Sequence, residues 1–367
     1  MSTLEPQKAL SGNQKVNTAK NSQKGAIASL SMGLALCAFL FSFSGCGSQP
    51  IKEDRQLAAK PIIWPSPPEP ARISYSTTIA NPSDIGANKG FFKKLAEFVL
   101  GSKSEDIIKP YGVVTDSTGR IIVADTAFKR VHIYDAKNGK YSYIDELDDN
   151  RYLESPISAA VDGEDNIYIT DSVLNKILVF SPKGQYLRSI GEGKRMTGIA
   201  INRQDKLLYV SDTGSHNIGV YDLKGGLVNT IGKLGDKDGE LNYPVDLFID
   251  NKNELYVTDT MNFRIQIFDK DGKFVSKIGK HGDGTGDLGR PKGVAVDHDG
   301  NIYIVDAIFD TVQIFDRSGN FLLNFGSVGR EAGKFWSPSG IYIDSADKVY
   351  VADSYNKRVQ VFEYHGN

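Results

Sequence analysis

Short apolar runs that end in an acidic residue recur along most of the chain. In six places such a run ends in Asp and is followed by Ser, Thr or Ala. Successive Asp residues are 46, 41, 47, 47 and 47 positions apart. A period of this length, filled with short β-type runs, is typical of propeller blades rather than of helical arrays. The repeated residues are Asp125, Asp171, Asp212, Asp259, Asp306 and Asp353.

The fifth unit shows the strands of one blade most clearly. β-type runs at 293–297, 301–305, 311–315 and 321–325 are separated by turns rich in Asp and Gly and by one loop. Val312 and Ile314 alternate with polar residues, as on a half-buried pleated strand. Four antiparallel strands make one blade. The chain is therefore predicted to be an all-β, six-bladed β-propeller of four-stranded antiparallel blades, with residues 110–367 forming the six repeats.

The two ends of the repeat array predict how the ring closes. The sixth unit has three strands, and only four residues follow Glu363. Residues 71–79 form a β-like stretch that belongs to no other blade. We expect this stretch to complete the last blade, because an open ring would leave an exposed sheet edge. The predicted propeller thus spans residues 71–367.

Residues 89–101 carry apolar side chains near helical spacing, including Phe91, Leu95 and Phe98. This spacing predicts one short amphipathic helix before the first blade. The helix either is a packed connection, or caps the central channel or docks a partner.

The repeats resemble a known family. Pro-x-Gly, then apolar-x-Asp, then Asp-Thr-x-Asn-x-Arg-Val-x-Val-Phe is similar to the NHL repeat, from Pro110 to the C-terminus. The whole chain, including Arg72-Ile73-Ser74-Tyr75 and the proline-rich segment before it, resembles a bacterial family of lipoprotein-like, six-bladed NHL propellers. That resemblance implies the fold, and it implies no defined activity.

The N-terminal segment has the features of an export signal. Four Lys residues precede an apolar stretch at 26–43. The end of this stretch and the residues after it read Phe43-Ser44-Gly45-Cys46. The latter resembles a lipobox, so we expect 1–45 to be a signal peptide and Cys46 to be lipidated. The alternative is an uncleaved membrane helix, because 18 residues are near the minimum that spans a bilayer. Both readings place the body in the cell envelope, outside the cytoplasm and tethered to the inner or outer membrane.

Proline density continues after Cys46. Residues 46–70 hold six prolines, which favour an extended, semi-rigid tether. The two cysteines, Cys37 and Cys46, both lie near the N-terminus, so no disulfide is expected in the propeller.

Charge argues against nucleic acid as a partner. Residues 1–45 hold four Lys and one Glu, so their removal lowers the 43 basic residues to 39 and the 45 acidic ones to 44. The net charge becomes −5, whereas nucleic-acid affinity depends on neutralising phosphates.

No residue pattern predicts a cofactor or a metal. The five His residues are scattered, without the paired spacing of a metal site. The repeated Asp is interpreted as structural, because a carboxylate there accepts N–H bonds within the loops.

The loops of one face differ most between the repeats. The loop that enters strand one and the loop between strands two and three lie on this face, which we call the loop face. Several of its loops are apolar where related repeats are polar. Such clusters either mark an interaction surface or fold back onto neighbouring blades. The candidate partner-binding residues are Phe128, Val173, Leu174, Met261, Phe263, Ile308 and Phe309.

The Pro-x-Gly motif that opens the first strand of each repeat also varies. Tyr111 and Lys292 occupy the middle position in two blades, and Asp246 replaces the glycine in another. These three residues are expected near the channel mouth, as ligand-binding candidates. Asp246 and Lys292, from adjacent blades, either contact a ligand or form a local salt bridge.

We therefore expect a non-catalytic, membrane-tethered binding or scaffold propeller that recognises an envelope protein, a peptide or a glycan on its loop face. The alternative is a propeller-fold enzyme of the lyase or lactonase kind, with its site in the channel. Three or more convergent carboxylate, Asn or His groups in the channel would favour the enzyme.

Overall fold

The computed structural model describes residues 60–87, 104–148 and 150–366. The chain divides into two units, residues 1–58 and 59–367, and the second contains all described residues. Cys46, the expected signal peptide and the predicted helix at 89–101 lie outside the described residues. Within the described part, no helix is long and apolar enough to cross a membrane.

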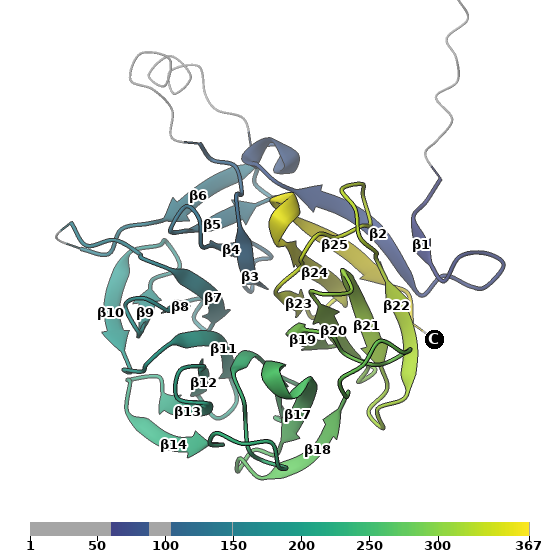
Figure 1. Cartoon of the computed structure of the whole chain (residues 1–367). Helices are drawn as coiled ribbons and strands as arrows, with labels where there is room; N and C mark the ends of the chain where they lie inside the picture. The colour runs from purple at the N-terminus through teal and green to yellow at the C-terminus, as the bar shows by residue number, and fades with distance from the viewer. Residues whose placement is uncertain (1–59, 88–103, 149, 367) are drawn as a thin grey trace, which may run out of the picture. The chain divides into compact units, whose positions relative to one another are not determined.

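Six antiparallel sheets surround a central axis, which confirms the predicted six-bladed propeller (Figure 1). Each blade begins with an inner strand at the axis and continues outward. Blade 1 contains β3 (Pro110–Thr115), β4 (Ile121–Asp125), β5 (Arg130–Asp135) and β6 (Lys140–Ile144). Blade 2 contains β7 (Pro156–Val161), β8 (Ile167–Asp171), β9 (Lys176–Phe180) and β10 (Tyr186–Ile190). Blade 3 contains β11 (Met196–Asn202), β12 (Leu207–Asp212), β13 (Asn217–Asp222) and β14 (Leu227–Ile231).

The remaining blades follow the same plan. Blade 4 contains β15 (Pro244–Ile249), β16 (Leu255–Asp259), β17 (Arg264–Phe268) and β18 (Phe274–Ile278). Blade 5 contains β19 (Pro291–Val296), β20 (Ile302–Asp306), β21 (Thr311–Phe315) and β22 (Phe321–Phe325). Blade 6 contains β23 (Ile341–Ile343), β24 (Lys348–Asp353), β25 (Arg358–Tyr364), β2 (Ile73–Ile79) and β1 (Ile63–Trp64). The described residues also form three short 3-10 helices, η1 (Pro82–Ile85), η2 (Thr260–Asn262) and η3 (Ser354–Asn356).

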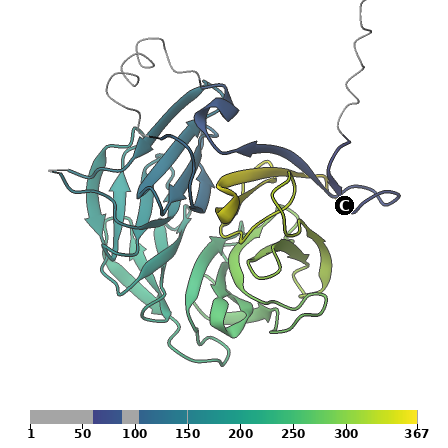
Figure 2. The same cartoon turned by 45° about the horizontal axis from the view of Figure 1, so that its top comes forward.

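The N-terminal strand closes the ring, as predicted. β2 pairs antiparallel with β25, with Ile73 opposite Tyr364 and Ile79 opposite Val359 (Figure 2). Two distant parts of the chain thereby share one sheet, and the ring has no gap at its sequence ends.

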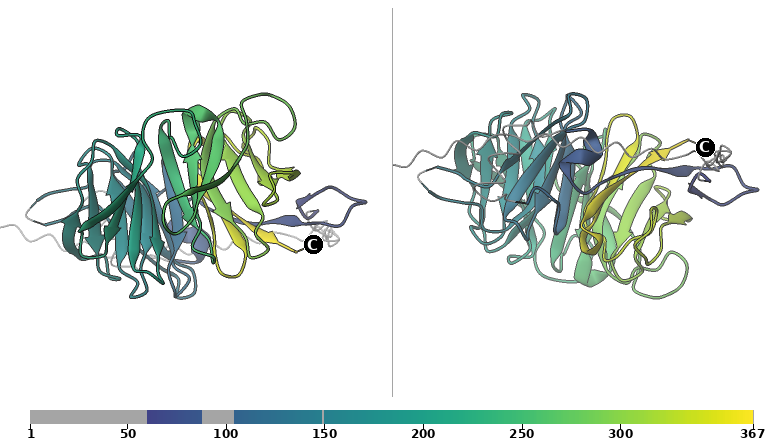
Figure 3. Two further views of the ribbon diagram at one scale, coloured as in Figure 1. Left: turned by 90° about the horizontal axis from the view of Figure 1, so that it is seen from below. Right: turned by 90° about the horizontal axis from the view of Figure 1, so that it is seen from above.

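One further strand was not foreseen. Ile63 and Trp64 form β1, which pairs with β2 inside the segment interpreted as tether. The Trp64 ring lies 5.7 Å from that of Phe325 and 5.9 Å from that of Phe362. The folded body therefore begins before residue 70, because β1 adds a fifth strand to the outer edge of blade 6 (Figure 3).

The core consists of one apolar cluster at each interface between neighbouring blades. Alternate side chains of the middle strands point to opposite faces of a sheet, so each blade contributes to two clusters. The closing strand does the same. Ile73 belongs to the cluster between blades 5 and 6, and Ile79 to the cluster between blades 6 and 1.

The repeated Asp joins the two loops of the loop face. In blade 5, Asp306 accepts hydrogen bonds from the backbone N–H groups of Gly289 and Arg290 and from those of Ile308 and Phe309. Buried backbone donors of both loops are thus satisfied by one carboxylate. The equivalent carboxylates of the other blades also accept loop N–H bonds, so the residue is structural, as interpreted.

In blades 3, 4 and 6, the hydroxyl of the residue after this Asp links neighbouring blades. Thr213 donates to the carbonyl of Pro244 at 2.6 Å, and Ser354 donates to that of Pro110 at 2.6 Å across the ring closure. Thr260 donates in the same way to the carbonyl of Pro291 at 2.9 Å. At these three junctions, the first residue of the next inner strand is held in place.

Candidate functional site

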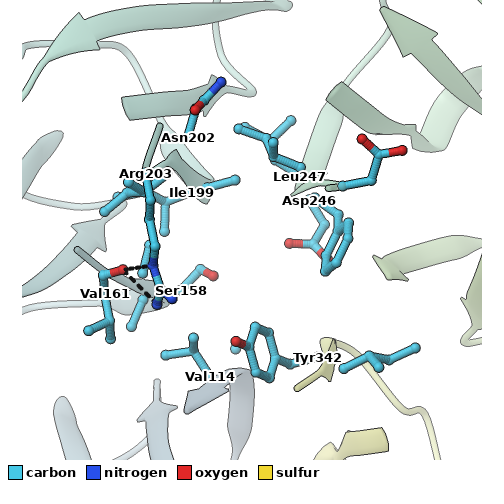
Figure 4. A pocket seen from close by; sticks show the side chains of 18 of the residues that line it. Val114, Ser158, Val161, Ile199, Asn202, Arg203, Asp246, Leu247 and Tyr342 are labelled. Atoms are coloured by element: carbon cyan, nitrogen blue, oxygen red, sulfur yellow. Dashed lines mark hydrogen bonds between the residues drawn. The ribbon is translucent and has the colours of Figure 1, made fainter. Parts of the chain in front are cut away.

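The inner strands enclose a cavity of about 440 Å³ in the central channel. Its lining comes from blades 1, 2, 3, 4 and 6 and includes Val114, Ile199, Leu247 and Tyr342 (Figure 4). Residues of the turns between strands one and two also line it, so the cavity extends toward the face opposite the loop face. We call this the turn face. Apolar walls with a few polar groups are typical of small-molecule sites.

Arg203 lies at the turn-face end of this cavity. Its Nε and Nη2 atoms both donate to the carbonyl of Val161, each at 3.2 Å, so its guanidinium reaches from blade 3 to blade 2 (Figure 4). Sequence analysis missed this residue, because nothing in the repeat distinguishes a turn arginine that folds inward from one that faces solvent.

Asp246 lines this cavity, at a position where most blades have glycine. A Cβ at Gly198 would lie 2.6 Å from the Asp246 Cα, so inner strands approach closely at this level. The Asp246 side chain turns toward blade 5, where its Oδ2 accepts from the N–H of Val294 at 3.2 Å. Burial raises the pKa of Asp246 to about 7, and the hydrogen bonds from the Val294 and Leu247 N–H groups only partly oppose this rise.

Asp246 gives a test by pH. A carboxyl whose folded pKa is raised favours folding when protonated, so this contribution is complete below about pH 4 and is lost as the pH rises through 7. Replacing Asp246 with Asn, which keeps an acceptor for Val294, should raise stability at pH 7.5 by about 1–4 kcal/mol relative to wild type. The gain should vanish at pH 4. Urea unfolding of both proteins across this range measures it, and parallel pH profiles would contradict the assignment.

Tyr111 and Lys292 meet at the other end of the channel. Each is the second residue of its inner strand, β3 and β19, and so lies at the loop-face end. Lys292 Nζ lies 3.4 Å from the Tyr111 hydroxyl, to which it donates, and 5.6 Å from the centre of the ring. The two residues come from blades 5 and 1, so their side chains meet across blade 6, where Ser339 occupies the same position.

The expected pairing of Asp246 with Lys292 is not formed. No ion pair joins them, and the Asp246 carboxylate instead accepts from the blade 5 backbone. Burial lowers the pKa of Lys292 to about 8, and nearby Arg290, Arg195 and Lys109 lower it further. Burial raises the pKa of Tyr111 to about 12, with Asp246 adding to the rise. The structure thus places all three channel candidates near one another. Asp246 raises the pKa of Tyr111, and Lys292 donates to the Tyr111 hydroxyl.

The seven apolar candidates all lie on the loop face but differ in exposure. Val173, Met261 and Ile308 are 61%, 56% and 57% exposed. The other four candidates are half-buried and fold back onto the protein, which was the second of the two interpretations. Phe263 packs on His281, with ring centres 4.2 Å apart, and Phe128 lies under the Arg130 guanidinium at 4.8 Å. Leu174 and Phe309 are half-buried as well.

Sequence analysis also missed an aromatic pair on the loop face. Trp336 and Tyr355 are 41% and 55% exposed, and their ring centres lie 5.7 Å apart. Arg330 lies over the Trp336 ring at 5.0 Å, and Lys109 over the Tyr355 ring at 5.9 Å. The signal was available: Tyr355 follows the repeated Asp353 by two residues, at the position of Val173 and Ile308 in their repeats.

In the described part of the chain, no group of three or more His, Cys, Asp or Glu side chains is placed to hold a metal ion.

Comparison with known proteins supports the fold. A family model described as DUF5128, 6-bladed beta-propeller, matches residues 150–231 and 248–312, and an NHL repeat model matches residues 335–362. No curated protein matches the chain.

Many solved structures share the architecture. A protein of unknown function from Bacteroides thetaiotaomicron is 18% identical, with a TM-score of 0.60, over 80% of this chain and 76% of that one. An auxiliary nutrient binding protein from the same organism is 12% identical, with a TM-score of 0.57, over 72% and 71%. Virginiamycin B lyase from Staphylococcus aureus is 14% identical, with a TM-score of 0.53, over 70% and 95%. At these identities the similarity establishes the fold alone.

Proposed function

Since the chain is a six-bladed β-propeller that carries an NHL repeat, we propose that it is a membrane-tethered, extracytoplasmic binding protein. Its partner is an envelope protein, a peptide or a glycan held on the loop face. The basic and apolar N-terminal segment that ends at Cys46 supports the location. A propeller with a similar fold is described as a nutrient binding protein, which is consistent with a binding role.

The observation that carries this proposal is the exposed apolar surface of the loop face. Val173, Met261 and Ile308 stand at equivalent loop positions in blades 2, 4 and 5, and Tyr355 continues the set in blade 6. A single exposed apolar side chain means little, but a repeated set on one face favours an interface. The carboxylates below these loops fix their backbone, so the surface is preformed.

Replacing Val173, Met261 and Ile308 together with Ser should remove most of the proteins or glycans that co-purify from envelope extracts. Each side chain loses its burial energy in the complex, about 1 kcal/mol or more, so the three together weaken binding about a hundredfold. The matched control replaces Leu227 and Val228 with Ser, since these are similarly exposed but lie on the outer strand of blade 3. Identical captured sets for wild type and the triple variant would refute the proposal.

A second candidate function rests on Asp246. A carboxyl with a pKa near 7, beside an apolar cavity, is suited to general acid–base catalysis. The cavity lining also holds Asp250, Asn202, Asn251 and Asn253, which are residue types that an enzyme of this fold would use. Among the described residues, no three His, Cys, Asp or Glu side chains are placed to hold a metal ion. Binding stays the leading proposal because it rests on the repeated apolar set of the loop face. Turnover of a captured ligand that stops in the Asp246→Asn variant would favour the enzyme.

A further inference from the structure

Basic residues surround the loop-face mouth of the channel at a regular interval. Lys109, Arg195 and Arg290 each precede the first residue of an inner strand, namely β3, β11 and β19. They therefore occupy the same position in blades 1, 3 and 5. Alternate blades of a six-bladed ring are evenly spaced around its axis, so the three side chains approach the mouth from three directions.

Lys292 adds a fourth positive charge inside this ring. Burial lowers the pKa of Lys292, and the nearby positive charges of Arg290, Arg195 and Lys109 lower it further. Within the described residues, none of the four forms an ion pair with a carboxylate; Lys292 has only the Tyr111 hydroxyl and ring. Four like charges held together without a counterion are unfavourable in the free protein.

The acidic side chains near this cluster have other partners. Glu154, at the rim in blade 2, is paired with Lys129 at 2.5 Å. The repeated Asp residues are buried under the loops and saturated by N–H groups. Asp246 lines the channel, and burial raises its pKa to about 7, so it is partly protonated at neutral pH. None of these carboxylates forms an ion pair with the four basic side chains, although the net charge of the protein is −2.

The basic groups are interleaved with aromatic rings. Arg195 donates to the Tyr243 hydroxyl at 2.9 Å and lies 5.9 Å from the centre of its ring. Tyr111 lies beneath Lys292, and Tyr355 beneath Lys109. Hydroxyl groups and ring faces of this kind orient the cations and offer a flat surface to the organic part of a ligand.

We propose that the loop-face mouth of the channel binds the oxyanion group, carboxylate or phosphate, of a small organic ligand. Lys292 and the Tyr111 hydroxyl contact the anion, and Lys109, Arg195 and Arg290 surround it. Charge-assisted hydrogen bonds from Lys and Arg to oxyanions are about twice as strong as neutral ones, and the ligand also relieves the repulsion among the four cations. This inference deepens the proposed binding function by naming the chemistry of the ligand.

Calorimetric titration of the full chain with inorganic phosphate and, separately, with glucuronate tests the site. Wild type should bind at least one of them at concentrations up to about 10 mM. Lys292→Gln should weaken binding about tenfold or more, since it removes the charge closest to the anion. Arg290→Gln, at an exposed position where the fold tolerates change, should weaken it about threefold. Tighter binding of phosphate identifies a phosphoryl group as the ligand's anion, and tighter binding of glucuronate identifies a sugar carboxylate.

Lys252→Gln is the matched control, because it removes one positive charge from the turn between β15 and β16, on the turn face. Its affinity should equal that of wild type. Equal weakening in Lys292→Gln and Lys252→Gln would overturn the site, as would the absence of binding of both anions to wild type. Melting curves confirm that each variant is folded. Failure here leaves the loop-face partner test unaffected, because that test replaces only apolar residues outside the mouth.

Discussion

A chain that begins at residue 84 is expected to lose most of the stability of the propeller. The truncation removes β2 and β1 and leaves β25 as an open sheet edge. Burial of Ile73 and Ile79 contributes about 3–6 kcal/mol together, an upper estimate that excludes the lost strand pairing. Net stabilities of proteins are about 5–15 kcal/mol, so this loss approaches the total. Thermal unfolding followed by circular dichroism, against a chain that begins at residue 60, measures the difference.

Point variants locate the effect within the closing strand. Ile73→Ala and Ile79→Ala should each cost about 2–5 kcal/mol, because both side chains are buried in different interblade clusters. Ser76→Ala is the control on the same strand, since its side chain is exposed, and it should change stability by less than about 0.5 kcal/mol. A truncated chain that melts at the temperature of the longer one would show that β2 does not hold the ring together.

Asp259→Ala is expected to be the most damaging single substitution in blade 4. The buried carboxylate accepts from the Asn242 N–H at 2.6 Å, from Arg264 Nε at 2.8 Å and from Gln266 Nε2 at 3.1 Å. Its removal leaves the buried Arg264 guanidinium without its close, buried counterion, and the remaining anionic partner, Asp238, is half exposed and 3.9 Å away. Breaking a buried pair in this way costs about 3–5 kcal/mol.

Urea unfolding at neutral pH measures the loss, with Asp271→Ala as the control. Asp271 lies in the turn after β17, exposed and paired only with Lys270, so its removal should leave stability unchanged. The double variant Asp259→Leu with Arg264→Met should be more stable than Asp259→Ala, because no unpaired charge remains in the interior. If Asp259→Ala and Asp271→Ala unfold at the same urea concentration, the repeated Asp does not brace the loops.

Much of the candidate site could be located from the sequence because the repeat fixes equivalent positions. Tyr111 and Lys292 were identified at the middle position of Pro-x-Gly and Asp246 as a replacement of its glycine, and the structure places them near one another. Their actual partners were not predictable. Lys292 contacts Tyr111, 181 residues away and across blade 6, rather than Asp246 in the adjacent blade. Such a contact depends on how far each side chain reaches over the axis, which the repeat does not encode.

The sequence by itself determined the blade count, the strands of each blade, the structural Asp and the closure by a stretch at 71–79, because each follows from local β pattern, turn residues and one missing strand. Only the tertiary structure decided that Trp64 extends the closing sheet, that Phe263 and Phe128 fold back while Met261 stays exposed, and that basic residues of alternate blades surround one mouth. The physical reason is that each repeat is defined by residues that lie close together in the sequence. The surfaces where ligands bind are assembled from residues brought together only when the ring closes.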